Sequence, residues 1–294
     1  MPQVHRPFAA ALWMMGSVAG FSLVAVAGRA LHPYLDTFGV MFYRSLVGIA
    51  LVVGGAAAAG RLAEISARHI GLHALRNIVH FAGQNLWLVA LSLIPLAQLF
   101  ALEFSYPIIV ALAAPFILSE HLSRTRMVAA AIGFAGVLIV ARPFGAGGLS
   151  VGLGAALLCS VGFAGAALAT KRLTRVVSIL SILFWLTVMQ TVLGLICAAA
   201  FGHLILPASA ALPWVLAIGS GGLGAHFCLT KALSLAPASL VTPIDFLRLP
   251  VIAIVGMLAY GEPLDTWVFV GGAVIFAANW LNIRDDAAGR KVAS

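Results

Sequence analysis

The stretch Ala90–Gln98, ALSLIPLAQ, returns 142 residues later as Ala232–Leu240, ALSLAPASL. The same offset aligns Glu120 with Glu262. Further matches at this offset are Leu122 with Leu264, Phe134 with Phe276, and Arg142 with Arg284. Matches that keep one offset over such a distance indicate an internal duplication. We therefore predict two repeat units, residues 1–143 and residues 144–294.

The composition places both units in a lipid bilayer. Hydrophobic residues make up 62% of the 294 positions, charged residues make up 9%, and the mean hydropathy is +1.09. These values lie outside the range of water-soluble domains. Ten apolar stretches approach the roughly 20 residues that a membrane-spanning helix needs. They are residues 8–28, 38–60, 72–94, 95–118, 126–142, 149–170, 178–201, 212–235, 238–260 and 266–283. The sequence thus predicts an all-α membrane protein with ten transmembrane helices.

Basic residues divide unequally between the two sides of such a bundle. Of 17 Lys and Arg, 13 fall at the termini and in the even-numbered loops, whereas Arg29 and Arg142 fall on the other side. Arg44 and Arg248 lie inside spans, and Arg44 is near enough to a helix end to extend its charge to the interface. Because cytoplasmic loops are rich in Lys and Arg, we predict an inner-membrane protein with both termini in the cytoplasm. Topology explains the positive charge, so no nucleic-acid partner is expected.

Five helices per repeat is an odd number, so the second repeat must enter the membrane from the opposite side. Inverted repeats are typical of secondary transporters, in which a substrate site lies between two halves that give access to each side in turn. A duplication that merely built a large helical bundle is the alternative. Since the loops are short throughout, the functional residues are expected inside the membrane region.

In these features the chain resembles the drug/metabolite transporter superfamily, in its EamA branch. The ten helices, the two signature stretches and the loop residues Glu120 and Glu262 carry the resemblance over essentially the whole chain. Within that branch it is similar to the YddG-type aromatic amino-acid exporters. The resemblance implies a basket in which helices three, four, eight and nine surround a central cavity. Helices one, two, six and seven would lie outside them, and helices five and ten at the periphery.

Polar side chains inside the predicted spans mark the candidate site, because an ionisable group at mid-membrane costs at least ~2.5 kcal/mol without a partner or water. The offset of 142 pairs Gln84 with His226 and Glu103 with Asp245. These four positions lie at equivalent depths on helices three, eight, four and nine. The candidate substrate-binding set also includes His80, Trp87, Tyr106 and Arg248 on these helices, and Trp185 in the middle of helix seven.

These candidates also have structural interpretations. Polar residues recur every three or four positions along residues 73–87, which suits either an aqueous path or hydrogen bonds between helices. Asp245 and Arg248 stand three residues apart, so each can neutralise the other with no role in binding. Glu103 has no oppositely charged neighbour within a helical turn, and it is therefore either a cavity residue or a protonated acid.

Prolines and glycines also interrupt the spans. Pro107, Pro243 and Pro250 are predicted inside helices four and nine, where each removes a backbone hydrogen bond and can kink the helix for gating. Proline is nevertheless frequent in membrane helices generally. Residues 219–224 match G-x-G-x-x-G, but they lie within an apolar span with no preceding strand pattern. Close helix packing is the expected role there, as in the GxxxG of residues 16–20.

The predicted lining combines acids, a base, imidazoles, an amide and aromatic rings. It suits an amino acid, aromatic ones first, with the ammonium near the acids and the carboxylate near Arg248 or an imidazole. A hydrophobic organic cation is the second cargo that the lining allows. Arg248 separates the two, because an unpaired arginine repels a cation whereas one held by Asp245 does not. The sequence sets neither the coupling ion nor the oligomeric state, and a monomer is compatible with it.

Other classes of protein are less favoured. The sequence contains no HExxH motif, no GxSxG motif and no pair of aspartate-rich motifs, so an intramembrane enzyme is not expected, and neither a cofactor nor a metal is predicted. Cys159, Cys197 and Cys228 fall inside spans without CxxC spacing and are expected to pack as small residues. A scaffold would need a sizeable loop for partners. The sequence therefore predicts an inverted-repeat carrier that exports small metabolites by alternating access.

Overall fold

The computed structural model describes residues 6–118, 124–142, 150–202, 204–235 and 241–292, and within these ranges every regular element is helical. The first repeat contains α1 (Pro7–Leu31), α2 (Thr37–Ala58), α3 (Ile70–Leu93), α4 (Leu96–Glu103), α5 (Tyr106–Leu118) and α6 (Arg124–Ala141). The second contains α7 (Val151–Leu173), α8 (Ile179–Phe201), α9 (Leu212–Leu235), the 3-10 helix η3 (Thr242–Leu247), α11 (Arg248–Tyr260) and α12 (Thr266–Val292). The connections hold the short 3-10 helices η1 (Leu62–Glu64) and η2 (Ser209–Ala211).

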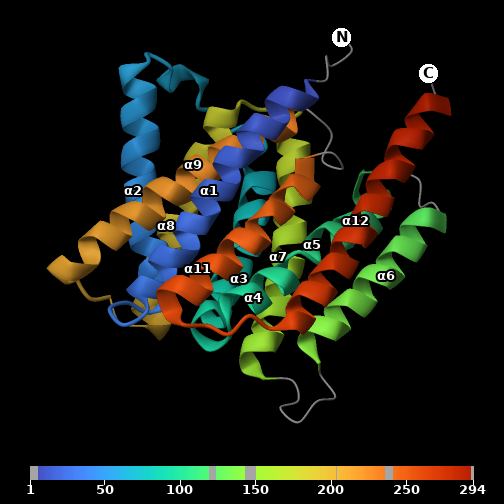
Figure 1. Ribbon diagram of the computed structural model, residues 1–294. Helices are drawn as coiled ribbons and strands as arrows, with labels where there is room; N and C mark the ends of the chain where they lie inside the picture. The colour runs from blue at the N-terminus through green and yellow to red at the C-terminus, as the bar shows by residue number, and fades with distance from the viewer. Residues whose placement is uncertain (1–5, 119–123, 143–149, 203, 236–240, 293–294) are drawn as a thin grey trace.

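The element bounds repeat at the offset found in the sequence. α3 and α9 begin and end 142 residues apart, and so do α5 and α11. The start of α1 and the end of α12 lie at the same end of the bundle (Figure 1), as an even number of crossings requires. The fold is thus the predicted pair of inverted five-helix repeats. The predicted boundary between residues 143 and 144, Glu120, and residues 236–240 of the second signature lie outside the described residues.

Helix length and composition agree with a membrane location. Among the described residues, α1, α2, α7, α8 and α9 are long and apolar enough to cross a bilayer. Shorter apolar helices lie within residues 96–110, 127–141, 248–260 and 266–281. α3 has 24 residues, but its buried side chains include His73, Asn77, His80 and Gln84. These polar groups lower the hydropathy of α3. Because their side chains are buried, the polar face of α3 lies inside the bundle.

The structure corrects the prediction that spans four and nine are single helices with prolines in their interiors. Span four breaks at Phe104–Ser105, and Pro107 stands in the first turn of α5. In the described part of span nine, η3 includes Pro243, and Pro250 stands in the first turn of α11. The N–H groups of a first turn have no partner within their helix, so a proline there removes no bond. Pro107 therefore begins a helix, whereas Pro250 lies just after the change from η3 to α11, and gating at these positions stays a prediction.

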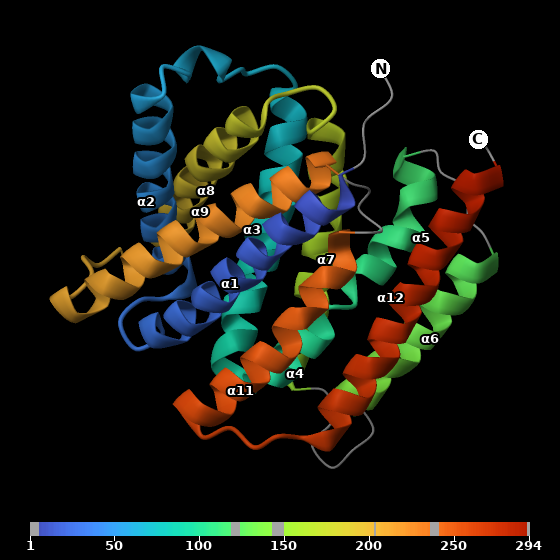
Figure 2. The same ribbon diagram turned by 45° about the horizontal axis from the view of Figure 1, so that its top comes forward.

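Two close helix contacts related by the repeat join the halves. A Cβ atom on Gly20 of α1 would lie 2.8 Å from the carbonyl oxygen of Gly221 in α9, and one on Gly162 of α7 would lie 2.8 Å from that of Val79 in α3. Gly20 and Gly162 are 142 residues apart, as are Val79 and Gly221. Within residues 219–224, Gly219 and Gly221 thus serve close packing, as predicted, whereas Gly224 has no atom within 4 Å of an added Cβ. The fifth and tenth spans, α6 and α12, pack against each other at one side of the bundle (Figures 1 and 2).

Gly162→Ala is expected to lower the free energy of unfolding by about 1 to 3 kcal/mol, the usual cost of overpacking. Gly154 on the same helix has no atom within 4 Å of an added Cβ. Gly154→Ala is therefore the matched control, and it should be neutral or slightly stabilising because alanine favours helix. Denaturant unfolding of the purified protein in detergent micelles measures both variants. Equal effects of the two substitutions would contradict the close contact between α7 and α3.

Candidate functional site

At the centre of the fold, Arg248 holds the two acids that the repeat relates. Its Nη2 atom lies 2.9 Å from Oε1 of Glu103 and 2.7 Å from Oδ2 of Asp245. Glu103 ends α4 and Asp245 lies in η3, so both acids come from the interrupted spans. All three side chains are buried, and Trp87 donates from Nε1 to Oε2 of Glu103 at 2.7 Å. We call Glu103, Asp245 and Arg248 the acid cluster.

Aromatic rings enclose the guanidinium of the acid cluster. The Cζ atom of Arg248 lies 4.8 Å from the ring centroid of Phe100, 5.3 Å from that of Phe104 and 5.1 Å from that of Phe21. Distances below about 6 Å are within the range of cation–π attraction. If both carboxyls are ionised, the cluster has two carboxylates against one guanidinium and therefore one formal negative charge. It can therefore attract a cation despite its arginine.

A pair of imidazoles lies beyond Phe21. The ring of Phe21 is 5.2 Å from that of His226, His226 is 5.0 Å from His80, and His80 is 5.9 Å from Phe163. Phe21 and Phe163 are 142 residues apart, so equivalent rings of α1 and α7 flank the imidazole pair of α3 and α9. Both phenylalanines are only partly buried. These four rings form a continuous run that starts at the acid cluster, and we call them the ring path.

Two buried arginines stand beside the ring path. Arg44 of α2 is 7% exposed and Arg76 of α3 is 3% exposed. Both interact electrostatically with His80 and His226. Within the part of the chain that the structure describes, neither arginine forms an ion pair with an aspartate or glutamate. We call Arg44 and Arg76 the arginine pair.

The remaining sequence candidates lie at different places. Tyr106 is buried at the start of α5 and interacts electrostatically with Asp245 and Arg248. Gln84 is buried on α3, one turn from His80. Trp185 lies in the second turn of α8, not in the middle of its span, and donates from Nε1 to the carbonyl of Ser66 at 2.9 Å. The structure therefore places Trp185 at a helix end, outside both the acid cluster and the ring path.

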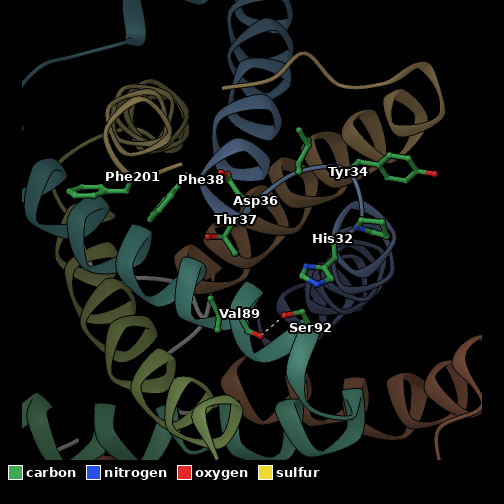
Figure 3. Close-up of a pocket in the computed structure, with 10 residues that line it drawn as sticks. His32, Tyr34, Asp36, Thr37, Phe38, Val89, Ser92 and Phe201 are labelled. Carbon is green, nitrogen blue, oxygen red and sulfur yellow. Dashed lines mark hydrogen bonds between the residues drawn. The ribbon is translucent and has the colours of Figure 1, made fainter. Parts of the chain in front are cut away.

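An open pocket of about 510 Å³ lies where α1 turns into α2 (Figure 3). Its lining comes from the α1–α2 turn together with α3 and α8, and includes His32, Tyr34, Asp36, Val89, Ser92 and Phe201. This volume falls within the usual range for small-molecule pockets. These residues are not distinctive in the sequence, because polar residues are expected in any connection that is exposed to water.

Near that pocket, one ion pair ties three segments together. Arg29 of α1 pairs with Glu262 in the α11–α12 connection. Arg29 also donates to the carbonyl oxygens of Leu91 and Ile94, and Oε2 of Glu262 accepts the N–H of Leu96 at 2.8 Å. The three backbone groups belong to the first signature stretch. That stretch therefore marks the place where α1 and the α11–α12 connection bind the junction of α3 with α4.

The fold and the central site define an inverted-repeat membrane carrier, and comparison with known proteins gives its family. The family model described as the EamA-like transporter family matches residues 8–142 and residues 150–284. The chain therefore belongs to this family of the drug/metabolite transporter superfamily, as the resemblance implied. It is a membrane transporter of small metabolites and not an enzyme.

Relatives with curated names are similar over most of their length. The chain is 29% identical to a riboflavin transporter from Rhizobium johnstonii, over 96% of this chain and 93% of that protein. It is 26% identical to an S-adenosylmethionine uptake transporter from Rickettsia prowazekii, over 90% and 89% of the two chains. A solved crystal structure with 19% identity superposes with a TM-score of 0.68 over 97% of this chain and 99% of its own, which shows the fold alone.

Proposed function

We propose that this chain carries metabolites that join a planar aromatic ring to an amino-acid head group, aromatic amino acids first, across the inner membrane by alternating access. The observation that carries the proposal is the ring path between the acid cluster and the arginine pair. A zwitterion with an aromatic side chain carries the three kinds of group that these sites complement: a cation, an anion and a ring. Both termini lie in the cytoplasm in this proposal, and export is the expected direction.

The acid cluster suits the ammonium group of such a cargo. It has one formal negative charge, and Oδ1 of Asp245 has no hydrogen-bond partner among the described residues. A buried acceptor without a partner gains from a charged N–H donor. Arg248 is held by both acids, which favours an imidazole, the other candidate from the sequence, as the partner of the cargo's carboxylate. The ring path supplies faces and edges for an aromatic side chain.

The names of the relatives support a cargo with a ring. Riboflavin and S-adenosylmethionine both contain planar heteroaromatic rings, and S-adenosylmethionine also carries an amino-acid head group and a sulfonium cation. The paired state of Arg248 favours a second candidate on the same fold, a hydrophobic organic cation. Such a cargo would use the acid cluster and the ring path and would not need the arginine pair.

Purified protein in liposomes is expected to exchange labelled phenylalanine or tryptophan saturably and faster than alanine. Phe21→Ala should weaken the apparent affinity about 2- to 10-fold, the value of a lost aromatic contact. Phe8→Ala is the matched control, because Phe8 is on the same helix and 77% exposed. Export of an organic cation without amino-acid exchange would reassign the cargo. Repeating the assay with and without a pH gradient shows whether transport is coupled to protons. S-adenosylmethionine and riboflavin are the competing substrates to add.

A further inference from the structure

Among the described residues, no carboxylate forms an ion pair with either arginine of the arginine pair. Charged groups inside proteins are paired, because removing a charge from water is costly, and the cost is greater inside a bilayer. Arg76 donates to two neutral oxygens, Oγ1 of Thr170 at 3.2 Å and Oδ1 of Asn77 at 3.0 Å. These hydrogen bonds orient the guanidinium but leave its charge uncompensated. In the described part of the chain, no carboxylate compensates Arg44 either.

A small hollow opens beside this positive charge. Its volume is about 20 Å³, and α2, α8 and α9 line it with Arg44, Gln190 and His226 among other residues. That volume accommodates about one water molecule, so it admits the end group of a ligand and not a whole metabolite. His80, in ring contact with His226, is 4% exposed, and its Nδ1 atom has no hydrogen-bond partner among the described residues. A buried polar atom without a partner marks a place where a ligand group fits.

We propose that the arginine pair and the imidazole pair form an oxyanion site that binds the carboxylate of the transported metabolite. Guanidinium groups match the two oxygens of a carboxylate, and imidazole nitrogens add further donors. The ring path connects this site to the acid cluster, so the two ends of the path complement opposite charges. The assignment rests on the proposed function only in naming the carboxylate of the cargo as the anion.

Binding of benzoate to the purified full-length protein in detergent tests the site without any transport step. Benzoate is expected to bind saturably, whereas its neutral isostere benzamide is not expected to bind. Arg44→Gln should weaken benzoate binding about 10- to 100-fold, the range for a hydrogen bond to a charged group. Arg61→Gln is the matched control, because Arg61 is exposed in a connection and already paired with Glu64. Unchanged affinity in Arg44→Gln, or equal binding of benzoate and benzamide, would overturn the proposal.

Two additional measurements keep the result interpretable. Arg44→Lys retains the charge and loses the forked geometry, so an intermediate loss of affinity is expected even where Arg44→Gln does not fold. Inorganic phosphate is the second probe, and binding of phosphate without benzoate would overturn the assignment to a carboxylate. If benzoate binds but phenylalanine is not exchanged, the proposed cargo fails and the oxyanion site stands. If phenylalanine is exchanged and Arg44→Gln binds benzoate normally, the site alone fails.

Discussion

Arg248→Gln is expected to abolish exchange and to lower the free energy of unfolding by about 3 to 5 kcal/mol, the usual cost of removing one partner from a buried ion pair. Glu103 and Asp245 are 5% exposed each. Without the guanidinium, these two carboxylates would face each other with no cation to compensate them. The rings of Phe21 and Phe100 would also lose the charge that they now enclose. Denaturant unfolding in micelles and exchange in liposomes measure the two effects separately.

A charge-neutral triple variant separates folding from transport. Glu103→Gln/Asp245→Asn/Arg248→Gln keeps the shape of the acid cluster and removes all its charges. Removing one partner of a buried ion network is costly because it leaves an uncompensated charge. The triple variant leaves no such charge, so it should recover much of the stability that Arg248→Gln loses. Exchange should not return, because the negative charge that attracts the ammonium is gone. If the triple variant exchanged substrate at the wild-type rate, the charges of the acid cluster would have a structural role and no role in transport.

The repeat in the sequence predicted which acids meet at the centre. An offset of 142 residues related Glu103 to Asp245, and spacing along one helix predicted that Asp245 and Arg248 could pair. Both expectations describe the same cluster, because Arg248 binds Asp245 on its own span and Glu103 from the other repeat. Duplication places equivalent residues at equivalent depths, and an inverted pair of helices brings them to one level.

Contacts between helices could not be predicted in the same way. Phe21 and Phe163 are apolar residues in apolar spans, so no polarity signal distinguishes them, although the repeat offset relates them. Arg44 and Arg76 lie near the ends of their helices, where cations usually reach water. Their burial depends on α2, α3, α8 and α9 packing around them, which hydropathy along one segment does not report. The changes of helix within spans four and nine could not be predicted from the sequence either. A proline is compatible both with the first turn of a new helix and with a kink in a continuous helix.

Glu262→Gln is expected to lower the free energy of unfolding by about 1.5 to 3 kcal/mol, the value of hydrogen bonds to charged groups. The variant keeps an oxygen for the N–H of Leu96 and removes the charge that holds Arg29. The Arg29 and Glu262 side chains are 17% and 14% exposed, whereas those of the Arg142–Asp265 pair in the same region are 47% and 32% exposed. Asp265→Asn is therefore the matched control, with an expected cost of about 0 to 1 kcal/mol.

A double-mutant cycle tests whether this ion pair acts as one unit with the first signature stretch. Arg29→Gln and Glu262→Gln should each cost nearly as much as the two together, because either one breaks the contact that positions the other. Strictly additive effects would show that each side chain binds the backbone of residues 91–96 independently. Coupled effects would explain why residues 90–98 and a loop glutamate occur together in this chain. The stretch supplies the backbone carbonyls and the N–H group that Arg29 and Glu262 bind, so it acts as a docking point between the two repeats.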